Sequence, residues 1–290
     1  MQNSHQHRNT NSFAVILGTN EIASAVAVHL YRAGYSVVLS HDPFPPVFRR
    51  KMSFHDALFD DQANLDGVVA QRVDTGVEIL TFWKDRNAVV ITELGLLDLI
   101  IVQKPALLID ARMQKYQVTP DLRRLANVTI GLGPSFIAGE NCDYAIETHP
   151  RKAGRILSNG ATDKATGIPP KLGRRGAERF AISEIPGRWY TPLEIGARIF
   201  KDYTIGFLGD TPINAPFDGI MRGLVRDGTE VPAGVKLLEI DPRGRNASWT
   251  GIESKARIIA LSVVQAITHH KQGKQVTAPT RSRASLNVVK

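Results

Sequence analysis

Residues 13–40 read FAVILGTNEIASAVAVHLYRAGYSVVLS, and this stretch indicates the fold class of the N-terminal half. The uninterrupted apolar run at 13–17 is typical of a buried parallel strand. Between residues 21 and 32 apolar side chains recur on one face of a helix, which Gly34 would end before a second apolar run at 36–40. The order strand, turn, helix, strand predicts an α/β unit of the dinucleotide-binding kind.

The turn after this first strand is a candidate cofactor site. In dinucleotide-binding proteins, glycines in the turn let a pyrophosphate approach the helix N-terminus. Here the second glycine position holds an asparagine and the third an alanine, so the fingerprint is incomplete. We expect either weak binding of a nucleotide or a scaffold that has lost its ligand. The residues assigned to this site are Gly18, Thr19, Asn20, Glu21 and Ala23.

The alternation of helix-like and strand-like pieces continues downstream. This pattern predicts one Rossmann-like domain over residues 13–127. The pieces lie at 76–84, 88–92, 94–102 and 106–110.

Polar side chains follow two of the predicted strands, at the edge where such sheets bind ligands. Arg49 and Arg50 stand in the proline-containing loop after the second strand. Paired guanidinium groups there suit an anion, with a solvated surface as the alternative. Asp110 ends a later apolar run, and its carboxylate could bind a hydroxyl group, orient a base or cap a turn.

Residues 128–182 form a glycine-rich central segment. Gly131 and Gly133, followed by Pro134, suit a backbone that turns sharply after a strand and offers amides to an anionic group. A multi-turn connection without a ligand is the alternative, because glycine-rich turns are common.

Glu147 is the acid/base candidate of this segment. It follows the apolar run at 144–146, which would tend to desolvate it. A structural salt bridge to Arg151 or Arg155 is the alternative role.

From residue 183 the pattern changes to short β runs with an internal repeat. Glycine and proline positions at 186–199 recur at 216–231 with a period of 32 residues, for example Gly187 and Gly219. This predicts a biotinyl/lipoyl-like flattened barrel over 183–245. The tip where the halves join, residues 209–212, has no lysine, so we expect neither biotin nor lipoate. A helix is expected within 246–271, with flexible tails at 1–12 and 272–290.

Composition narrows the function classes. Lys and Arg number 36 against 28 Asp and Glu, and the formal charge of +8 favours acidic partners. The sequence contains no basic run interleaved with aromatic residues, so we do not expect nucleic-acid binding. The single cysteine, Cys142, excludes an intrachain disulfide and a multi-cysteine zinc site, and we predict no metal site. Without a signal peptide or a membrane-length apolar stretch, a cytoplasmic protein is expected.

Several short sequence segments, taken in their order along the chain, resemble those of the YqeB-type maturation proteins associated with selenium-dependent molybdenum hydroxylases. They lie at 46–54, 110–111, 130–139, 146–148, 154–155, 160–161, 166–169, 215–219 and 241–244. The resemblance implies roles in binding an anionic ligand for Arg49, Arg50, Thr148, Arg155, Thr166 and Gly167. Relatives carry an Arg-Gly-His triplet where this chain has His149-Pro-Arg-Lys152, so no role of that histidine is transferred to His149.

Three functions are open from the sequence. The resemblance implies an accessory protein that binds a molybdopterin-type ligand or a nucleotide and assists a molybdenum hydroxylase client. The N-terminal unit alone would fit an NAD(P)-dependent oxidoreductase acting on a small anionic, phosphate-bearing substrate. A non-catalytic interaction protein on a vestigial Rossmann scaffold is the third. The sequence does not indicate the oligomeric state.

Overall fold

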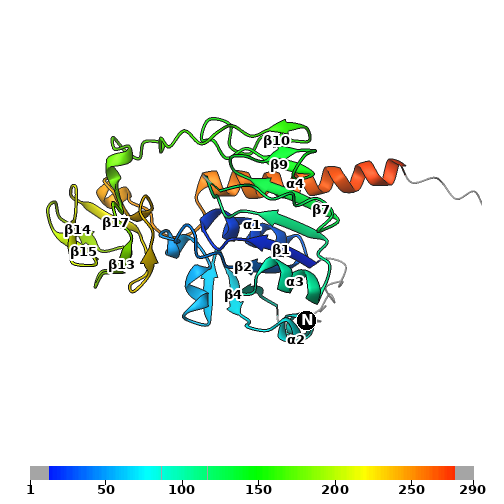
Figure 1. Ribbon diagram of the computed structural model, residues 1–290, viewed down its shortest axis with the longest axis horizontal. Coiled ribbons are helices and arrows are strands. Elements are labelled where there is room, and N and C mark those ends of the chain that lie inside the picture. Colours follow the sequence, from blue (N-terminus) through cyan, green and yellow to red (C-terminus); the bar gives the residue numbers. More distant parts are fainter. Residues whose placement is uncertain (1–12, 86, 116, 278–290) are drawn as a thin grey trace, which may run out of the picture.

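The computed structural model describes residues 13–85, 87–115 and 117–277. Its largest part is a nine-stranded mixed sheet with the strand order β10-β9-β7-β6-β1-β2-β5-β4-β3 (Figure 1). The strands are β1 (Phe13–Leu17), β2 (Ser36–Ser40), β3 (Gln62–Leu65), β4 (Val68–Arg72), β5 (Val89–Thr92), β6 (Leu107–Asp110), β7 (Val128–Leu132), β9 (Tyr144–Ile146) and β10 (Ile156–Leu157).

Only the two outermost strands of this sheet, β10 and β3, run antiparallel to their neighbours. The chain leaves β1 for β2 on one side and later returns to place β6 on the other side of β1. The carboxyl ends of β1 and β6 therefore diverge into loops that run in opposite directions, which is where open parallel sheets bind ligands.

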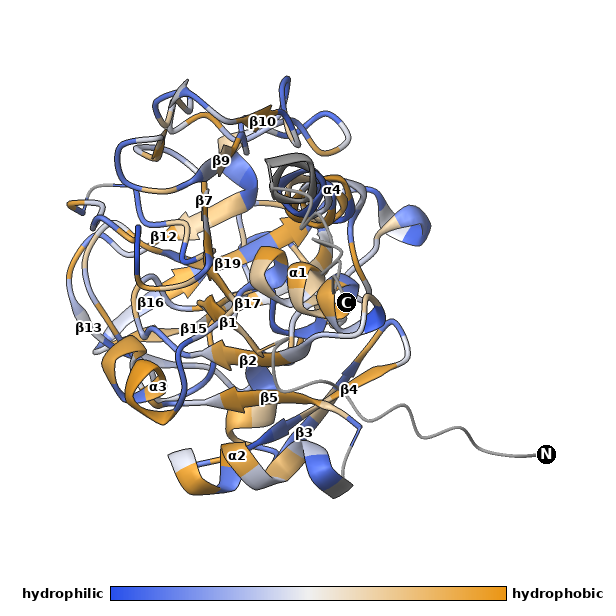
Figure 2. Ribbon diagram, turned by 90° about the vertical axis from the view of Figure 1, so that its right-hand side faces the viewer, coloured by the Kyte–Doolittle hydropathy of each residue, from blue (hydrophilic) through white to orange (hydrophobic). Residues whose placement is uncertain are grey.

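Helices cover both faces of the sheet, which explains why β1, β2 and β7 are buried along their whole length. The helices α1 (Glu21–Arg32) and α4 (Ser254–Thr277) pack together on one face, and α2 (Gly76–Asp85) and α3 (Leu96–Val102) lie on the other (Figure 2). The predicted β1, α1 and β2 are confirmed at the predicted residues.

Beside this sheet stand two four-stranded antiparallel sheets, here called the β-module. Their orders are β12-β19-β17-β14 and β16-β15-β13-β18, and they enclose a separate apolar core around Trp189. The strands are β12 (Phe180–Ile182), β13 (Gly187–Tyr190), β14 (Arg198–Ile199), β15 (Thr204–Leu208), β16 (Thr211–Asn214), β17 (Gly219–Leu224), β18 (Glu230–Val231) and β19 (Lys236–Asp241).

The 32-residue repeat is visible in the order of these strands. Gly187 and Gly219 begin β13 and β17, and Thr204 and Lys236 begin β15 and β19, at the same separation. Replacing each strand of one sheet by its repeat partner reproduces the order of the other sheet. The two halves therefore exchange strands, and each half alone would leave its sheets incomplete.

Short elements make the connections. β8 (Ile137–Ala138) pairs with β11 (Gly160–Ala161) in a separate two-stranded antiparallel sheet. Single 3₁₀ turns lie at η2 (Arg50–Met52), η3 (His55–Leu58), η4 (Ala177–Arg179) and η5 (Gly244–Asn246).

The structure differs from the sequence-based expectations in two places. The β3–β4 hairpin was not predicted, because β3 is short and largely exposed and lacks an apolar alternation. The C-terminal helix α4 continues to Thr277, beyond the tail boundary expected at residue 272. The expected tail at 1–12, and residues 278–290 of the tail expected at 272–290, lie outside the described residues. No described helix combines the length and the apolar character needed to cross a membrane.

The main sheet and the β-module meet where the loop after β2 runs along β17, and we call this contact the joint. The amide of Leu224 donates to the carbonyl of Phe48 at 2.6 Å. A Cβ on Gly223 would lie 2.6 Å from the ring of Phe48 and 3.1 Å from its carbonyl oxygen. The joint therefore requires glycine at this position.

We expect Gly223→Ala to destabilise the protein by about 1–3 kcal/mol, because the added methyl group would force the joint apart. Urea denaturation measures the change. Gly187→Ala is the matched control, since this glycine also lies in a strand of the β-module but its Cβ would only make ordinary contact at 3.4 Å with Leu208. Equal losses in the two variants would contradict the proposed tight contact.

Candidate functional site

Polar side chains from distant parts of the chain gather at the carboxyl ends of β1, β2 and β6. The turn at Gly18 lies against the loop that follows β6, where a Cβ on Gly18 would approach the carbonyl oxygen of Ala111 to 3.1 Å. Gly18 also has a φ of +102°, which disfavours other residues. The glycine is thus required by the close approach of two backbone segments, whether or not a ligand binds.

Asn20 caps helix α1. Its Oδ1 accepts hydrogen bonds from the amides of Ile22 at 3.0 Å and Ala23 at 3.1 Å, and its Nδ2 donates to the carbonyl of Ala111 at 2.7 Å. These amides belong to the first turn, whose unpaired N–H groups bind phosphate in nucleotide-binding proteins. In this chain the asparagine side chain occupies two of them, and the carboxylate of Glu21 follows directly.

A hydrogen-bonded triad of Thr19, His55 and His41 lies at this turn, with Thr19 and His55 buried. The Thr19 hydroxyl is 3.0 Å from Nδ1 of His55 and 3.2 Å from Nδ1 of His41. Burial, followed by the neighbouring His41, lowers the pKa of His55 to about 3, and burial also lowers the pKa of His41. Both imidazoles are therefore neutral at pH 7. Because the hydroxyl has one proton, it donates to one ring and accepts from the other.

Sequence reasoning missed these histidines as site residues. His41 could have been noticed because it directly follows the second strand, at the ligand-binding edge. His55 carries no comparable signal, since only the path of the loop after β2 brings it back to Thr19.

Asp110 is buried and holds the loop that follows β6. Its carboxylate accepts from the backbone amide of Arg112 and from the guanidinium of the same residue, with a closest distance of 2.6 Å. The carboxylate of Asp42, after β2, accepts a hydrogen bond from the side-chain amide of Gln114 at 3.0 Å and lies 3.4 Å from the guanidinium of Arg112. These contacts tie the loops after β2 and β6 together across the end of β1.

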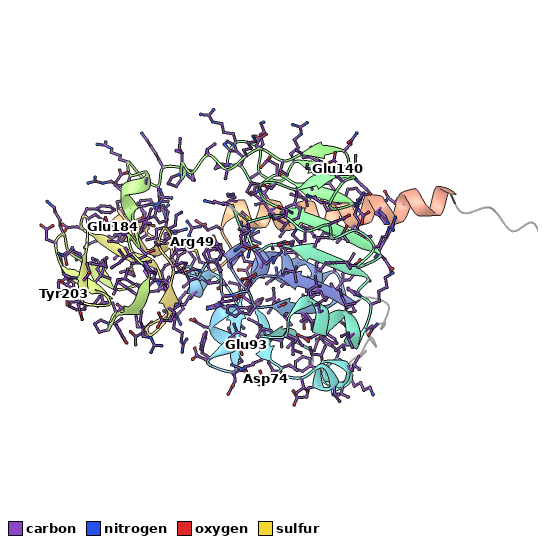
Figure 3. The ribbon with its side chains drawn as sticks, in the orientation of Figure 1. Arg49, Asp74, Glu93, Glu140, Glu184 and Tyr203 are labelled. Carbon is purple, nitrogen blue, oxygen red and sulfur yellow. The ribbon has the colours of Figure 1, made fainter. Side chains whose placement is uncertain are left out.

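Arg49 and Arg50 lie at the joint. Arg49 lies between the main sheet and the β-module (Figure 3). It binds Glu239 of the β-module at 2.8 Å and also contacts Glu21 and Glu253. Arg50 is buried. Its guanidinium donates to Asp56 at 2.9 Å and to the carbonyl oxygen of Leu224 at 2.9 Å. The donors of both arginines are thus engaged by the protein itself, and an anion would have to displace those carboxylates to bind here.

Glu147 is buried, and its carboxylate joins its own backbone segment to the segment at Asp163. One carboxylate oxygen accepts from the amides of Thr148 at 2.7 Å and His149 at 2.6 Å, and the other accepts from the amide of Asp163 at 2.6 Å. No ion pair links Glu147 to an arginine within the described residues, and Arg155 instead offers its backbone carbonyl to the Glu147 amide. The geometry makes Glu147 a structural clamp, and an acid/base role remains a prediction.

The glycine-rich turn after β7 is closed by its own chain. The ring of Phe136 covers Gly131, where a Cβ would meet it at 2.0 Å, and the amide of Gly133 donates to the carbonyl of Ile146. Thr162 donates to the Gly133 carbonyl at 2.7 Å. Pro134 has no backbone N–H group that could donate to an anion. The Gly133 amide is therefore already used, and the anion cradle remains a prediction.

The other predicted residues of this segment lie apart. Thr148 is buried, and its hydroxyl would lie 3.8 Å from a Cβ on Gly133. Arg155, Thr166 and Gly167 are exposed, the last two in the connection to the β-module. Cys142 is fully buried, and burial raises its thiol pKa to about 12, so it is not a ready nucleophile. In the described part of the chain no three His, Cys, Asp or Glu side chains are grouped to hold a metal ion.

Replacing Glu147 by Gln should destabilise the protein by about 1–3 kcal/mol, because an amide group would face at least one backbone N–H without accepting from it. Thermal and urea unfolding measure this loss. Glu140→Gln on the exposed neighbouring turn is the control (Figure 3). A change no larger than that of the control would contradict the clamp.

Asn20 can be tested with three substitutions. Asn20→Ala should cost about 1 kcal/mol of stability, whereas Asn20→Gly should restore part of this and free the amides of Ile22 and Ala23. Calorimetric titration with NAD and ADP should then show tighter binding for Asn20→Gly than for the unchanged protein. Asn20→Asp keeps the cap acceptor and should not gain affinity. Equal titrations for the Gly and Asp variants would contradict the blocking role of the cap.

Comparison with known proteins gives a curated relative by sequence and distant matches among solved structures. No family model matches the chain. It is 31% identical over 262 residues to an uncharacterized protein, YqeB, of Escherichia coli (strain K12), covering 90% of this chain and 48% of that protein. The chain therefore spans about half the length of this curated relative.

Two solved structures of the ectoine utilization protein EutE (DoeB) from Ruegeria pomeroyi also match. The product-bound form has a TM-score of 0.20 at 17% identity and covers 29% of this chain and 27% of that chain. The apo form has a TM-score of 0.23 at 13% identity and covers 78% and 85%. These scores support no argument about fold or chemistry. The sequence relationship shows the family: over 90% of its length, the chain belongs to the YqeB-type family.

Proposed function

We propose that the chain is an accessory protein that holds a phosphate-bearing ligand and assists a molybdenum hydroxylase. The ligand would be a pterin-type molybdenum cofactor precursor or a nucleotide, as the resemblance of the sequence motifs implies. The observation that supports a ligand site is the gathering of polar side chains at the carboxyl ends of β1, β2 and β6, where the strand order diverges.

The strand order supports this placement. Without the β3–β4 hairpin and the edge strand β10, the order β5-β2-β1-β6-β7-β9 is that of a Rossmann-type sheet, in which ligands bind beside the first strand. We infer that the hairpin was added at one edge of such a sheet. The internal repeat of the β-module likewise fits a biotinyl/lipoyl-like barrel. Its tip is the turn at Gly209 and Asp210 between β15 and β16, which offers no lysine for attachment.

The β-module would enclose the ligand from the second side. The joint brings β17 and β19 against the loop after β2, and Arg49 connects Glu239 of the module to Glu21 at the start of α1. A ligand at the carboxyl edge would thus face both parts of the protein, which suits binding sites between domains.

An NAD(P)-dependent oxidoreductase is the second candidate. Its support is the strand order beside β1 and the glycine turn at residue 18. Against it, the Asn20 side chain occupies the helix amides that would receive a pyrophosphate. A non-catalytic interaction protein is the third candidate, and the structural contacts of Glu147 and Arg50 favour it.

Native mass spectrometry of the freshly purified protein distinguishes these functions. We expect a bound mass that corresponds to a phosphorylated pterin or a mononucleotide, and the loaded protein should increase the activity of a molybdenum hydroxylase client. A bound dinucleotide would instead support the oxidoreductase. No bound small molecule, together with no effect on the client, would contradict the proposal.

Gly18→Ala should lower ligand retention, because its methyl group would press on the loop after β6 at the centre of the site. Gly34→Ala is matched to it, since Gly34 also has a positive φ but no atom within 4 Å of its Cβ position. Circular dichroism shows whether both variants remain folded. Equal retention in the two variants would place the ligand elsewhere.

A further inference from the structure

An open cavity lies beside the segment that follows β19. It has a volume of about 520 Å³ and is lined by Gly173, Arg174, Arg175, Pro242 and Arg243. The first three residues belong to the connection that leads from the main sheet into β12, and the last two follow the end of β19. Three arginines from two distant segments therefore border the same hollow.

The two segments are held together by a tight turn. Leu172 and Arg175 exchange backbone hydrogen bonds of 2.8 and 3.1 Å, which close a two-residue turn. Gly173 in this turn has a φ of +59°, and a Cβ there would lie 3.3 Å from Cγ of Arg243 and 3.5 Å from Cγ of Pro242. Close packing of the turn against the segment after β19 thus brings the arginines to one cavity.

Arg243 is oriented by a buried carboxylate. Its Nε and Nη2 donate to Asp241 at 2.9 and 2.6 Å, and Asp241 also accepts from the backbone amide of Arg243 at 3.0 Å. This fork leaves the Nη1 side of the guanidinium without a hydrogen-bond partner among the described residues, and 33% of the side chain is exposed. The guanidinium is therefore held in place with one edge open to a ligand.

The other two arginines carry charge that the described residues do not pair. Arg174 and Arg175 are exposed, and neither forms an ion pair in the part of the chain that the structure describes. The guanidinium carbon of Arg175 lies 4.7 Å from the ring centroid of Phe217, and such a ring attracts a cation without neutralising it. The carboxylate of Glu178 lies near Arg175 but accepts from the backbone amide of Gly176. The cavity thus keeps a surplus of positive charge.

The chemistry of this lining suits a phosphoryl group. Neighbouring cations repel one another, and an anion between them relieves that repulsion. The paired N–H groups of a guanidinium match the oxygens of a phosphate, which can accept from several arginines at once. The volume is in the range of about 300–1,000 Å³ that is usual for small-molecule sites, so the cavity can hold more than the phosphoryl group itself.

We propose that Arg174, Arg175 and Arg243 bind the phosphoryl group of a small phosphate monoester in this cavity. The inference goes beyond the proposed function, because none of these residues lies at the carboxyl ends of β1, β2 and β6. It gives the β-module a ligand site of its own. The two arginines without an ion-pair partner favour a dianion, so the dephosphorylated compound should not bind here.

Inorganic phosphate is the probe, titrated calorimetrically into the full chain at constant ionic strength and about pH 8, where it is mainly a dianion. We expect saturable binding that Arg174→Gln and Arg175→Gln each weaken by about tenfold and that the double variant abolishes. Because the cavity is open to water, raising the salt concentration should weaken binding as well. Arg243 stays unchanged in these variants, so that the buried carboxylate of Asp241 keeps its partner and the protein remains folded.

Arg198→Gln is the matched control. Arg198 is also exposed in the β-module, and its guanidinium carbon lies 5.3 Å from the ring centroid of Phe200, but it does not line the cavity. This variant should bind phosphate like the unchanged protein. No saturable heat in the unchanged protein, or equal binding by the double variant and the control, would overturn the site.

Phenylglyoxal, which modifies accessible guanidinium groups, gives an independent measurement. Peptide mapping by mass spectrometry should find Arg174 and Arg175 protected in saturating phosphate, while Arg198 is modified at an unchanged rate. Equal modification of all three with and without phosphate would contradict the proposal. Phosphate binding that Gly18→Ala removes and the double variant retains would place the anion at the carboxyl ends of the main sheet and overturn this site too.

Discussion

The architecture depends on the buried ion pairs around Glu239. This carboxylate is fully buried in β19, and burial alone would raise its pKa. The guanidinium of Arg49, aided by Arg179 and Arg222, instead holds the pKa below its ordinary value. Since a buried carboxylate without partners is strongly destabilising, Glu239 depends on Arg49 from the loop after β2 together with Arg179 and Arg222 beside it. Two parts of the chain with separate apolar cores thus share one electrostatic constraint.

This constraint explains how the candidate site is positioned. Arg49 also contacts Glu21 and Glu253, so the start of α1 and the start of α4 converge on the same guanidinium. The carboxyl edge of the sheet, the β-module and the C-terminal helix are held together without a ligand.

The turn at 18–23 shows how the chain can form a strand-turn-helix unit without the complete glycine fingerprint of dinucleotide-binding proteins. A glycine at position 20 would leave the first helical amides open to a pyrophosphate, whereas Asn20 satisfies them from within the chain. The same side chain also bonds to Ala111 and so fastens the turn to the loop after β6. The cap makes the turn more self-sufficient and less suited to a dinucleotide.

The sequence by itself determined the local elements and the repeat. The apolar run at 13–17 and the helical periodicity at 21–32 depend on neighbouring residues, and the 32-residue spacing is read directly along the chain; each appears in the structure. The partners of the charged side chains were decided by the tertiary structure alone. Arg49 meets Glu239 190 residues away along the chain, and His55 meets Thr19 only after a loop returns. A local pattern shows that a cation is present, but which group neutralises it depends on segments that folding brings together.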